Sequence, residues 1–93
     1  MQKIPRKIIL SEKLTVTDRL KRIDIHIKDG ESITLNDTAS DFFREIQKHD
    51  SFELVMKNLC KLYDIDENEI LDDALALVES LQEYGVVSCE YVI

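Results

Sequence analysis

The stretch RIDIHIKDGESITLNDTASDFF, residues 22–43, changes its hydrophobic period in the middle. From Ile23 to Ile27 every second residue is an isoleucine, which places the isoleucines on one face of a strand and the charged residues on the other. SITL, residues 32–35, alternates in the same way, and the Asp-Gly pair between the two segments is typical of a hairpin turn. From Asn36 the apolar residues recur at the spacing of a helix. The stretch therefore predicts a β-hairpin followed directly by a helix.

A third strand is predicted on the N-terminal side of this hairpin. LTVT, residues 14–17, alternates likewise, so we expect an antiparallel sheet across residues 14–35 with one apolar face. The segment MQKIPRKIIL before it is short and broken by Pro5, which makes it a poor signal peptide. We expect no membrane contact and a cytoplasmic protein.

Three helices are predicted after the sheet, each from an N-cap residue followed by apolar residues at helical spacing. The first follows Asn36 and ends near His49, the second begins at Ser51, and the third follows Asp66 and ends before Gly85. The three apolar stripes are Ala39, Phe42, Phe43 and Ile46; Phe52, Val55, Met56, Leu59 and Tyr63; and Ile70, Ala74, Leu77, Val78 and Leu81.

The boundaries of the third helix are the best specified. Asp66 and Glu69 have the spacing of a capping box, and Ile65 with its partner Ile70 has that of a hydrophobic staple. Gly85 suits the left-handed position just past the helix end, and the β-prone residues 86–93 are suited to a terminal strand.

The order of these elements predicts an α+β fold that is winged-helix-like, a three-stranded antiparallel sheet followed by three helices. A chain of 93 residues has room for one modest core, so we expect a single domain over residues 1–93. Monomer and weak homodimer both remain open.

Charge is distributed unevenly along the chain, whose net charge is −7. Residues 1–35 hold eight basic and five acidic residues, whereas residues 36–93 hold four and fourteen. Residues 64–83 carry eight acids and no base. This stretch would repel phosphate, so we expect no nucleic-acid partner.

Chemistry-bearing residues are few and scattered. Cys60 and Cys89 lack a Cys-x-x-Cys spacing, and a metal site would need them to converge with His26 and His49 from four separate elements. We therefore predict no catalytic residues, no metal and no cofactor.

Two segments resemble the signature of the PqqD family. The first is Thr34-Leu35-Asn36-Asp37-Thr38-Ala39 with Phe42-Phe43 following, and the second runs from Asp73 through Leu81 to Gly85. The resemblance covers roughly residues 14–87. It implies a non-catalytic, RiPP-type recognition element that binds the leader of a ribosomally made precursor peptide. It also implies delivery of that peptide to a modifying enzyme, such as a radical SAM enzyme or a leader peptidase.

The resemblance further implies where the leader binds, as an added strand beside the third strand with its side chains in a groove towards the third helix. Edge strands offer unpaired backbone groups for such pairing. Leu71 and Leu75 either widen the core stripe or form the floor of the groove, and the acidic residues Asp72, Asp73, Glu79 and Glu83 either form a solvated face or attract basic leader residues. The predicted peptide-binding residues are Ser32, Ile33, Thr34, Leu35, Leu71, Asp72, Leu75 and Val78.

Two alternatives remain open at this stage. A winged-helix nucleic-acid-binding regulator would share the fold but should have a basic third helix. The second rests on Asp50-Ser51-Phe52, which resembles the Asp-Ser-Leu helix start of acyl carrier proteins, where the serine bears a phosphopantetheine arm. The strands predicted before Asn36 disfavour that reading, and Ser51 is then a helix cap.

Overall fold

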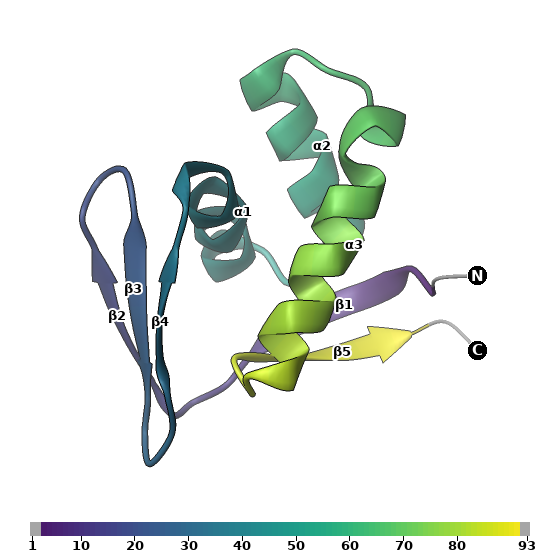
Figure 1. Cartoon of the computed structure of the whole chain (residues 1–93). Helices are drawn as coiled ribbons and strands as arrows, with labels where there is room; N and C mark the ends of the chain where they lie inside the picture. The colour runs from purple at the N-terminus through teal and green to yellow at the C-terminus, as the bar shows by residue number, and fades with distance from the viewer. Residues whose placement is uncertain (1–2, 92–93) are drawn as a thin grey trace.

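The computed structural model describes residues 3–91 and contains five strands and three helices (Figure 1). The elements in chain order are β1 (Pro5–Leu10), β2 (Leu14–Asp18), β3 (Ile23–Ile27), β4 (Ser32–Leu35), α1 (Asp37–Lys48), α2 (Phe52–Tyr63), α3 (Glu67–Glu83) and β5 (Val87–Tyr91).

The predicted three-stranded sheet is confirmed. Its order is β2-β3-β4, and both pairs are antiparallel. Ile25 lies opposite Val16 on one side and Ile33 on the other, so the alternating apolar residues share the inner face. All three isoleucines of β3 are buried there.

The hairpin turn between β3 and β4 depends on Asp29 as well as on Gly30. Asp29 has a φ of 60°, a left-handed conformation that Asp tolerates better than most residues. The Gly30 N–H donates to the Ile27 carbonyl at 2.9 Å, and a Cβ at Gly30 would lie 3.2 Å from Ile27 Cγ2. The Asp-Gly pair thus closes a tight turn against the strand that precedes it.

β1 and β5 form a second sheet, of which only β5 was predicted. β5 agrees with the predicted terminal strand as far as Tyr91, and residues 92–93 of that prediction lie outside the described residues. β1 had no prediction, because its burial repeats every third residue, at Pro5 and Ile8, and its pairing shifts register between Pro5 and Lys7. A strand with such an irregularity does not show the period of two by which strands are recognised.

Two of the three predicted N-cap residues form the expected side-chain hydrogen bond. Asn36 Oδ1 accepts from the Ala39 N–H at 2.8 Å, and Ser51 Oγ accepts from the Leu54 N–H at 3.3 Å. The Asp66 side chain makes no capping hydrogen bond, so the predicted capping box is wrong, and Glu69 N–H donates to the Asp66 backbone carbonyl instead. Gly85, with a φ of 79°, occupies the left-handed position after α3 as predicted.

The buried apolar residues form one cluster that joins both sheets to the helices. Phe43 at its centre is fully buried, with Ile8 of β1 and Leu81 of α3 at 1% exposure. β1 and β5 lie side by side beneath one end of α3, whereas the three-stranded sheet lies beyond α1 (Figure 1). Both termini of the described chain therefore lie on the side of α3 away from β4. No helix among residues 3–91 has the length and apolarity needed to cross a membrane.

Candidate functional site

The backbone of β4 is open along one edge. β4 is the last strand of its sheet, and no further strand pairs with it within the described residues. The Ile27 N–H donates to the Glu31 carbonyl at 3.1 Å. Since hydrogen-bonded and non-hydrogen-bonded residue pairs alternate along an antiparallel hairpin, this bond determines which residues of β4 bond to β3. Backbone groups of Ile33 consequently point towards β3, and those of Ser32 and Thr34 point towards the open edge. An extended peptide could therefore form backbone hydrogen bonds at Ser32 and Thr34.

The side chains of β4 divide between two faces. Ser32 and Thr34 are exposed on the outer face, where Ser32 Oγ lies 2.7 Å from His26 Nδ1 and the Thr34 hydroxyl donates to Asp24 at 2.8 Å. Ile33 is half-buried on the inner face and Leu35 is buried. A ligand at this edge would form hydrogen bonds with backbone groups, and it would contact apolar side chains only on the inner face of the sheet.

A buried hydroxyl holds the end of β4 in place. Ser40 in α1 is fully buried, and its Oγ accepts from the Ile23 N–H at 2.9 Å while donating to the Leu35 carbonyl at 3.2 Å. The same side chain thus joins the first turns of α1 to the ends of β3 and β4. These two hydrogen bonds hold the open edge of β4 in a fixed position relative to α1.

An apolar hollow of about 370 Å³ lies among the three helices. Thr38, only three residues after the last residue of β4, is part of its wall. The remaining wall residues come from α1, α2, α3 and the α2–α3 connection: Phe42, Leu59, Tyr63, Ile65, Ile70, Asp73, Ala74 and Leu77. Ile65 and Ile70, predicted as a staple, meet in this wall.

Leu75 and Val78 do not line this hollow and lie instead on the side of α3 that faces β1 and β5; their role in peptide binding stays a prediction. Leu75 is 7% exposed and Val78 is 2% exposed, and both face a surface hollow that they share with Pro5 of β1 and Tyr91 of β5. Leu71 is half-buried in a hollow with Pro5 and the start of α2. The physical reason is that β5 packs against this side of α3, with Pro5 of β1 beside it.

Leu77, assigned to the core from the sequence, takes the position expected of a groove residue. It is half-buried and lines the hollow among the helices. Asp72 and Asp73 are both exposed, and of the two only Asp73 lines this hollow. Among residues 3–91 none of the six acids of α3 takes part in an ion pair.

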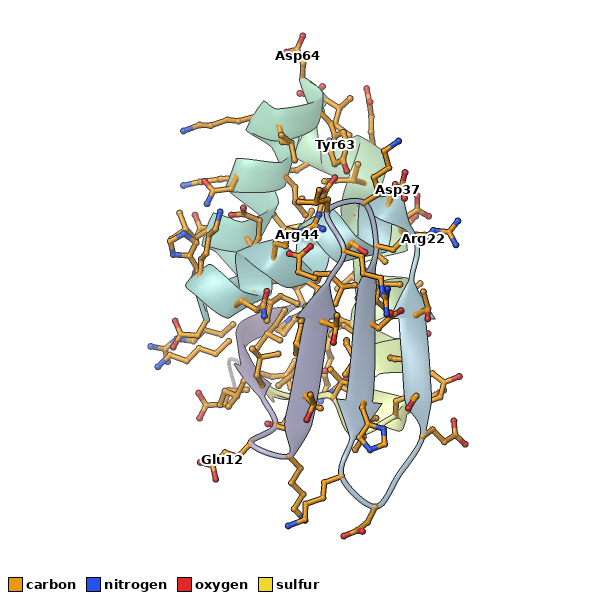
Figure 2. The ribbon with its side chains drawn as sticks, turned by 90° about the vertical axis from the view of Figure 1, so that its left-hand side faces the viewer. Glu12, Arg22, Asp37, Arg44, Tyr63 and Asp64 are labelled. Carbon is orange, nitrogen blue, oxygen red and sulfur yellow. The ribbon has the colours of Figure 1, made fainter. Side chains whose placement is uncertain are left out.

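A polar network holds one wall of the hollow. Arg44 binds both carboxylate oxygens of Asp18 at 2.8 Å, the Leu20 carbonyl at 2.6 Å and Asp41 at 3.0 Å. Asp41 in turn accepts a hydrogen bond from the Tyr63 hydroxyl. Figure 2 shows Arg44 beside the end of the sheet, with Tyr63 above it on α2. The network connects the β2–β3 turn to the hollow through α1.

The pKa values of Asp18 and Tyr63 are shifted in the directions that preserve the hydrogen bonds of this network. The hydrogen bond from Arg44, followed by that from the Leu20 N–H, lowers the pKa of Asp18 to about 2. Partial burial, followed by the hydrogen bond to Asp41, raises the pKa of Tyr63 to about 12. Asp18 is therefore charged and Tyr63 neutral at ordinary pH.

The sequence singled out neither Tyr63 nor Thr38 as a site residue. Tyr63 appeared there only as the last member of the α2 core stripe, but its side chain is 38% exposed. Its partner Asp41 lies 22 residues away, and helical spacing carries no information about such a contact. A tyrosine at the exposed end of an apolar stripe was the one available signal.

The residues considered for other chemistry stay apart. Ser51 is half-buried and caps α2, and Cys60 and Cys89 are free thiols whose pKa values burial raises. Within residues 3–91 no three His, Cys, Asp or Glu side chains group closely enough to hold a metal ion.

One family model and one solved structure are similar to this chain. The family model described as coenzyme PQQ synthesis protein D (PqqD) matches residues 23–87, which is most of the chain. Among curated proteins no match was found. A solved structure described as TbiB1 in complex with the TbiA(beta) leader peptide is similar to this chain with a TM-score of 0.79. The likeness covers 86% of this chain and 94% of that one at 14% identity, so it supports the fold. On the match over residues 23–87, this chain belongs to the PqqD family.

Proposed function

We propose that the protein is a non-catalytic module that binds the leader of a ribosomally synthesised precursor peptide and presents it to a modifying enzyme. A radical SAM maturase and a leader peptidase are the candidate enzymes. Membership of the PqqD family supports this proposal, as does the similar fold of TbiB1, whose solved structure contains a leader peptide. Such a module would act in the cytoplasm, where precursor peptides are translated.

The observation that carries the proposal is the open edge of β4. The backbone groups of Ser32 and Thr34 point away from β3, and the register leaves them free for an added strand. Backbone pairing of this kind supplies affinity, and alternate side chains of the added strand supply selectivity. We assign Ser32 and Thr34 to hydrogen bonding, with Ile33 and the end of β4 at Leu35 as apolar contacts of the leader.

We assign Ile70 and Leu77 of α3 to the site as well, and the roles predicted for Leu71, Leu75 and Val78 stay predictions. Ile70 and Leu77 are half-buried and line the hollow on the side of α1, so a ligand could cover them further. A leucine that passes from half-buried to buried contributes up to roughly 1–2 kcal/mol to binding. Asp72, exposed on α3, stays a prediction as a contact for basic leader residues.

A backbone N-methyl scan of a bound leader tests the added strand. Each peptide carries one N-methyl group, and its affinity for the whole chain is measured by calorimetry. If the leader pairs with β4, methylation at every second position should weaken binding by roughly tenfold, because each methyl removes a hydrogen bond and blocks close approach. Methylation at the intervening positions should change little. Uniform tolerance of methylation across the peptide would rule out strand addition.

A further inference from the structure

Leu20, in the turn between β2 and β3, is the most exposed large apolar residue among residues 3–91, at 88%. It is also the central residue of a γ-turn, because the Lys21 N–H donates to the Arg19 carbonyl at 2.9 Å and Leu20 has a φ of 74°. This form of the γ-turn is rare and strained, and a bulky side chain at positive φ is an outlier. Glycine or asparagine would adopt the same backbone at lower cost, so the stability of the fold does not explain a leucine here.

Hydrogen bonds on both sides of Leu20 hold the turn in this conformation. The Leu20 N–H donates to Asp18 Oδ1 at 2.9 Å, and Arg44 of α1 donates to the Leu20 carbonyl at 2.6 Å. Arg44 also binds both carboxylate oxygens of Asp18, so the two groups that hold Leu20 are themselves fixed. Strain of this kind persists only where the surrounding contacts enforce it, and it concentrates at functional sites. The turn thus presents the Leu20 side chain to solvent from a rigid backbone.

The most exposed charges at the tip of the turn are basic. Lys21 is exposed and takes part in no ion pair within the described residues. Arg22 lies 3.9 Å from the Asp37 carboxylate, and Arg19 is paired with the less exposed Asp24. Water strongly screens a long pair between two exposed side chains, so Arg22 also remains available to a partner. A protein surface that fits this turn would have an apolar pocket with carboxylates around it.

The turn lies away from the edge to which we assign the leader. It joins β3 to β2, the outer strand on the opposite side of the sheet from β4. Figure 2 shows Arg22 and Arg44 at the end of the sheet that carries this turn. A second protein could therefore bind the turn while a leader occupies β4.

We propose that this turn is the docking site for the modifying enzyme, with Leu20 inserted into an apolar pocket of the enzyme and Lys21 and Arg22 facing carboxylates around that pocket. A few residues that enter pockets of the partner supply most of the affinity of an interface, and the charges around them speed association. Nucleic acid and anionic membranes are poorer partners, because the whole chain has a net charge of −7 and repels them. This inference rests on the proposed function, because it names the surface used by the enzyme proposed there.

Asparagine substitutions test the docking site in the whole chain, with the radical SAM enzyme or leader peptidase encoded nearest to this protein's gene as the probe. Leu20→Asn removes the apolar side chain and keeps a residue that tolerates positive φ. Leu62→Asn is the matched control, because Leu62 is a 62% exposed leucine of α2 outside the turn. Leu20→Asn should weaken enzyme binding, measured by biolayer interferometry, at least about tenfold, and Leu62→Asn should bind within about twofold of the parent.

Lys21→Glu tests the acidic border of the pocket. It should slow association with the enzyme about fivefold or more and change dissociation little, because a charge at the rim of an interface acts mainly on the association rate. The difference from the parent should shrink as the salt concentration rises to about 0.5 M. An association rate equal to that of the parent would overturn the assignment of carboxylates to the pocket.

Thermal melts and leader titrations complete the test. The melting temperature of Leu20→Asn should equal or exceed that of the parent, because the substitution relieves strain; a fall of more than about 5 °C would show that Leu20 serves the fold and would overturn the proposal. Equal enzyme affinity of the parent and Leu20→Asn, or no affinity of the parent, would overturn it as well. Leader affinity, measured by calorimetry, should be the same for both proteins. A parent that binds no leader would count against the proposed function, whereas the enzyme affinities of the variants concern the turn alone.

Discussion

Leu75 and Leu77 are two residues apart in α3 and serve opposite sides of it. Leu75 is buried on the side that faces Pro5 and Tyr91, while Leu77 is half-buried in the hollow that faces α1. A single turn of the helix thus carries a residue needed for the fold on one side and one available to a ligand on the other. This division determines what substitutions on α3 should do.

Leu77→Glu should weaken leader binding far more than it weakens folding. A half-buried leucine becomes fully buried only with a ligand, and loss of that burial corresponds to about a tenfold fall in affinity. Leu75→Glu is the matched variant, because the same change there places a charge in the core and should unfold the domain. Calorimetric titration and thermal melts of both variants provide the measurement. A folded Leu75→Glu protein would show that the division between the two sides of α3 is wrong.

Ser40→Ala should cost about 1–3 kcal/mol of unfolding free energy. The hydroxyl partners the Ile23 N–H and the Leu35 carbonyl in a fully buried position, so its removal leaves both without that partner. Ser80→Ala on the exposed face of α3 is the control and should change stability by less than about 0.5 kcal/mol. Chemical denaturation measures both, and equal stability of the two variants would contradict the bridging role of Ser40.

Acid stability should depend on Asp18. Its pKa in the folded protein, about 2, is lower than its ordinary value of 3.8, so the folded state favours the charged carboxylate. The resulting stabilisation is complete above pH 4 or so and is lost as the pH falls towards 2. Asp18→Asn should therefore flatten the dependence of unfolding free energy on pH between about 4 and 2, measured by urea denaturation at each pH. An unchanged slope in this range would mean that the Arg44 bond forms only weakly in solution.

Specific binding to duplex DNA should be undetectable. A winged-helix regulator would use its third helix to read DNA, but α3 has six acids and no base to meet phosphate. Fluorescence anisotropy with a random-sequence duplex library at about 150 mM salt provides the measurement. Sub-micromolar, sequence-dependent binding would favour a regulator instead.

The sequence predicted the central architecture because two clear periods specify it. The alternation at Ile23, Ile25 and Ile27 defines the sheet, and the apolar stripes after Asn36 and Ser51 define helices with caps that the structure confirms. These signals are local, so they can be recognised without knowing which strands and helices pack against each other.

Which side of α3 is covered by other elements could not be predicted in the same way. Both Leu71–Leu75 and Ile70–Leu77 are apolar pairs at helical spacing, and only the packing of β5 and Pro5 beside α3 makes Leu75 buried and leaves Leu77 half-buried. β1 pairs with β5 nearly 80 residues along the chain and has an irregular register, so no local pattern announces it. The Tyr63–Asp41 contact was out of reach for the same reason, since it joins two helices.

The pair Thr34→Pro and Thr34→Val tests strand addition at β4 most directly. Both changes remove the hydroxyl, but only proline removes the backbone N–H that points to the open edge, and proline is tolerated where that N–H bonds to no neighbouring strand. Affinity for a leader is measured by calorimetry, after circular dichroism has verified that both variants are folded. If the leader pairs with β4, Thr34→Val should bind within about twofold of the parent, and Thr34→Pro should lose roughly tenfold or more in affinity. A folded Thr34→Pro protein that binds the leader as tightly as Thr34→Val would contradict strand addition at β4.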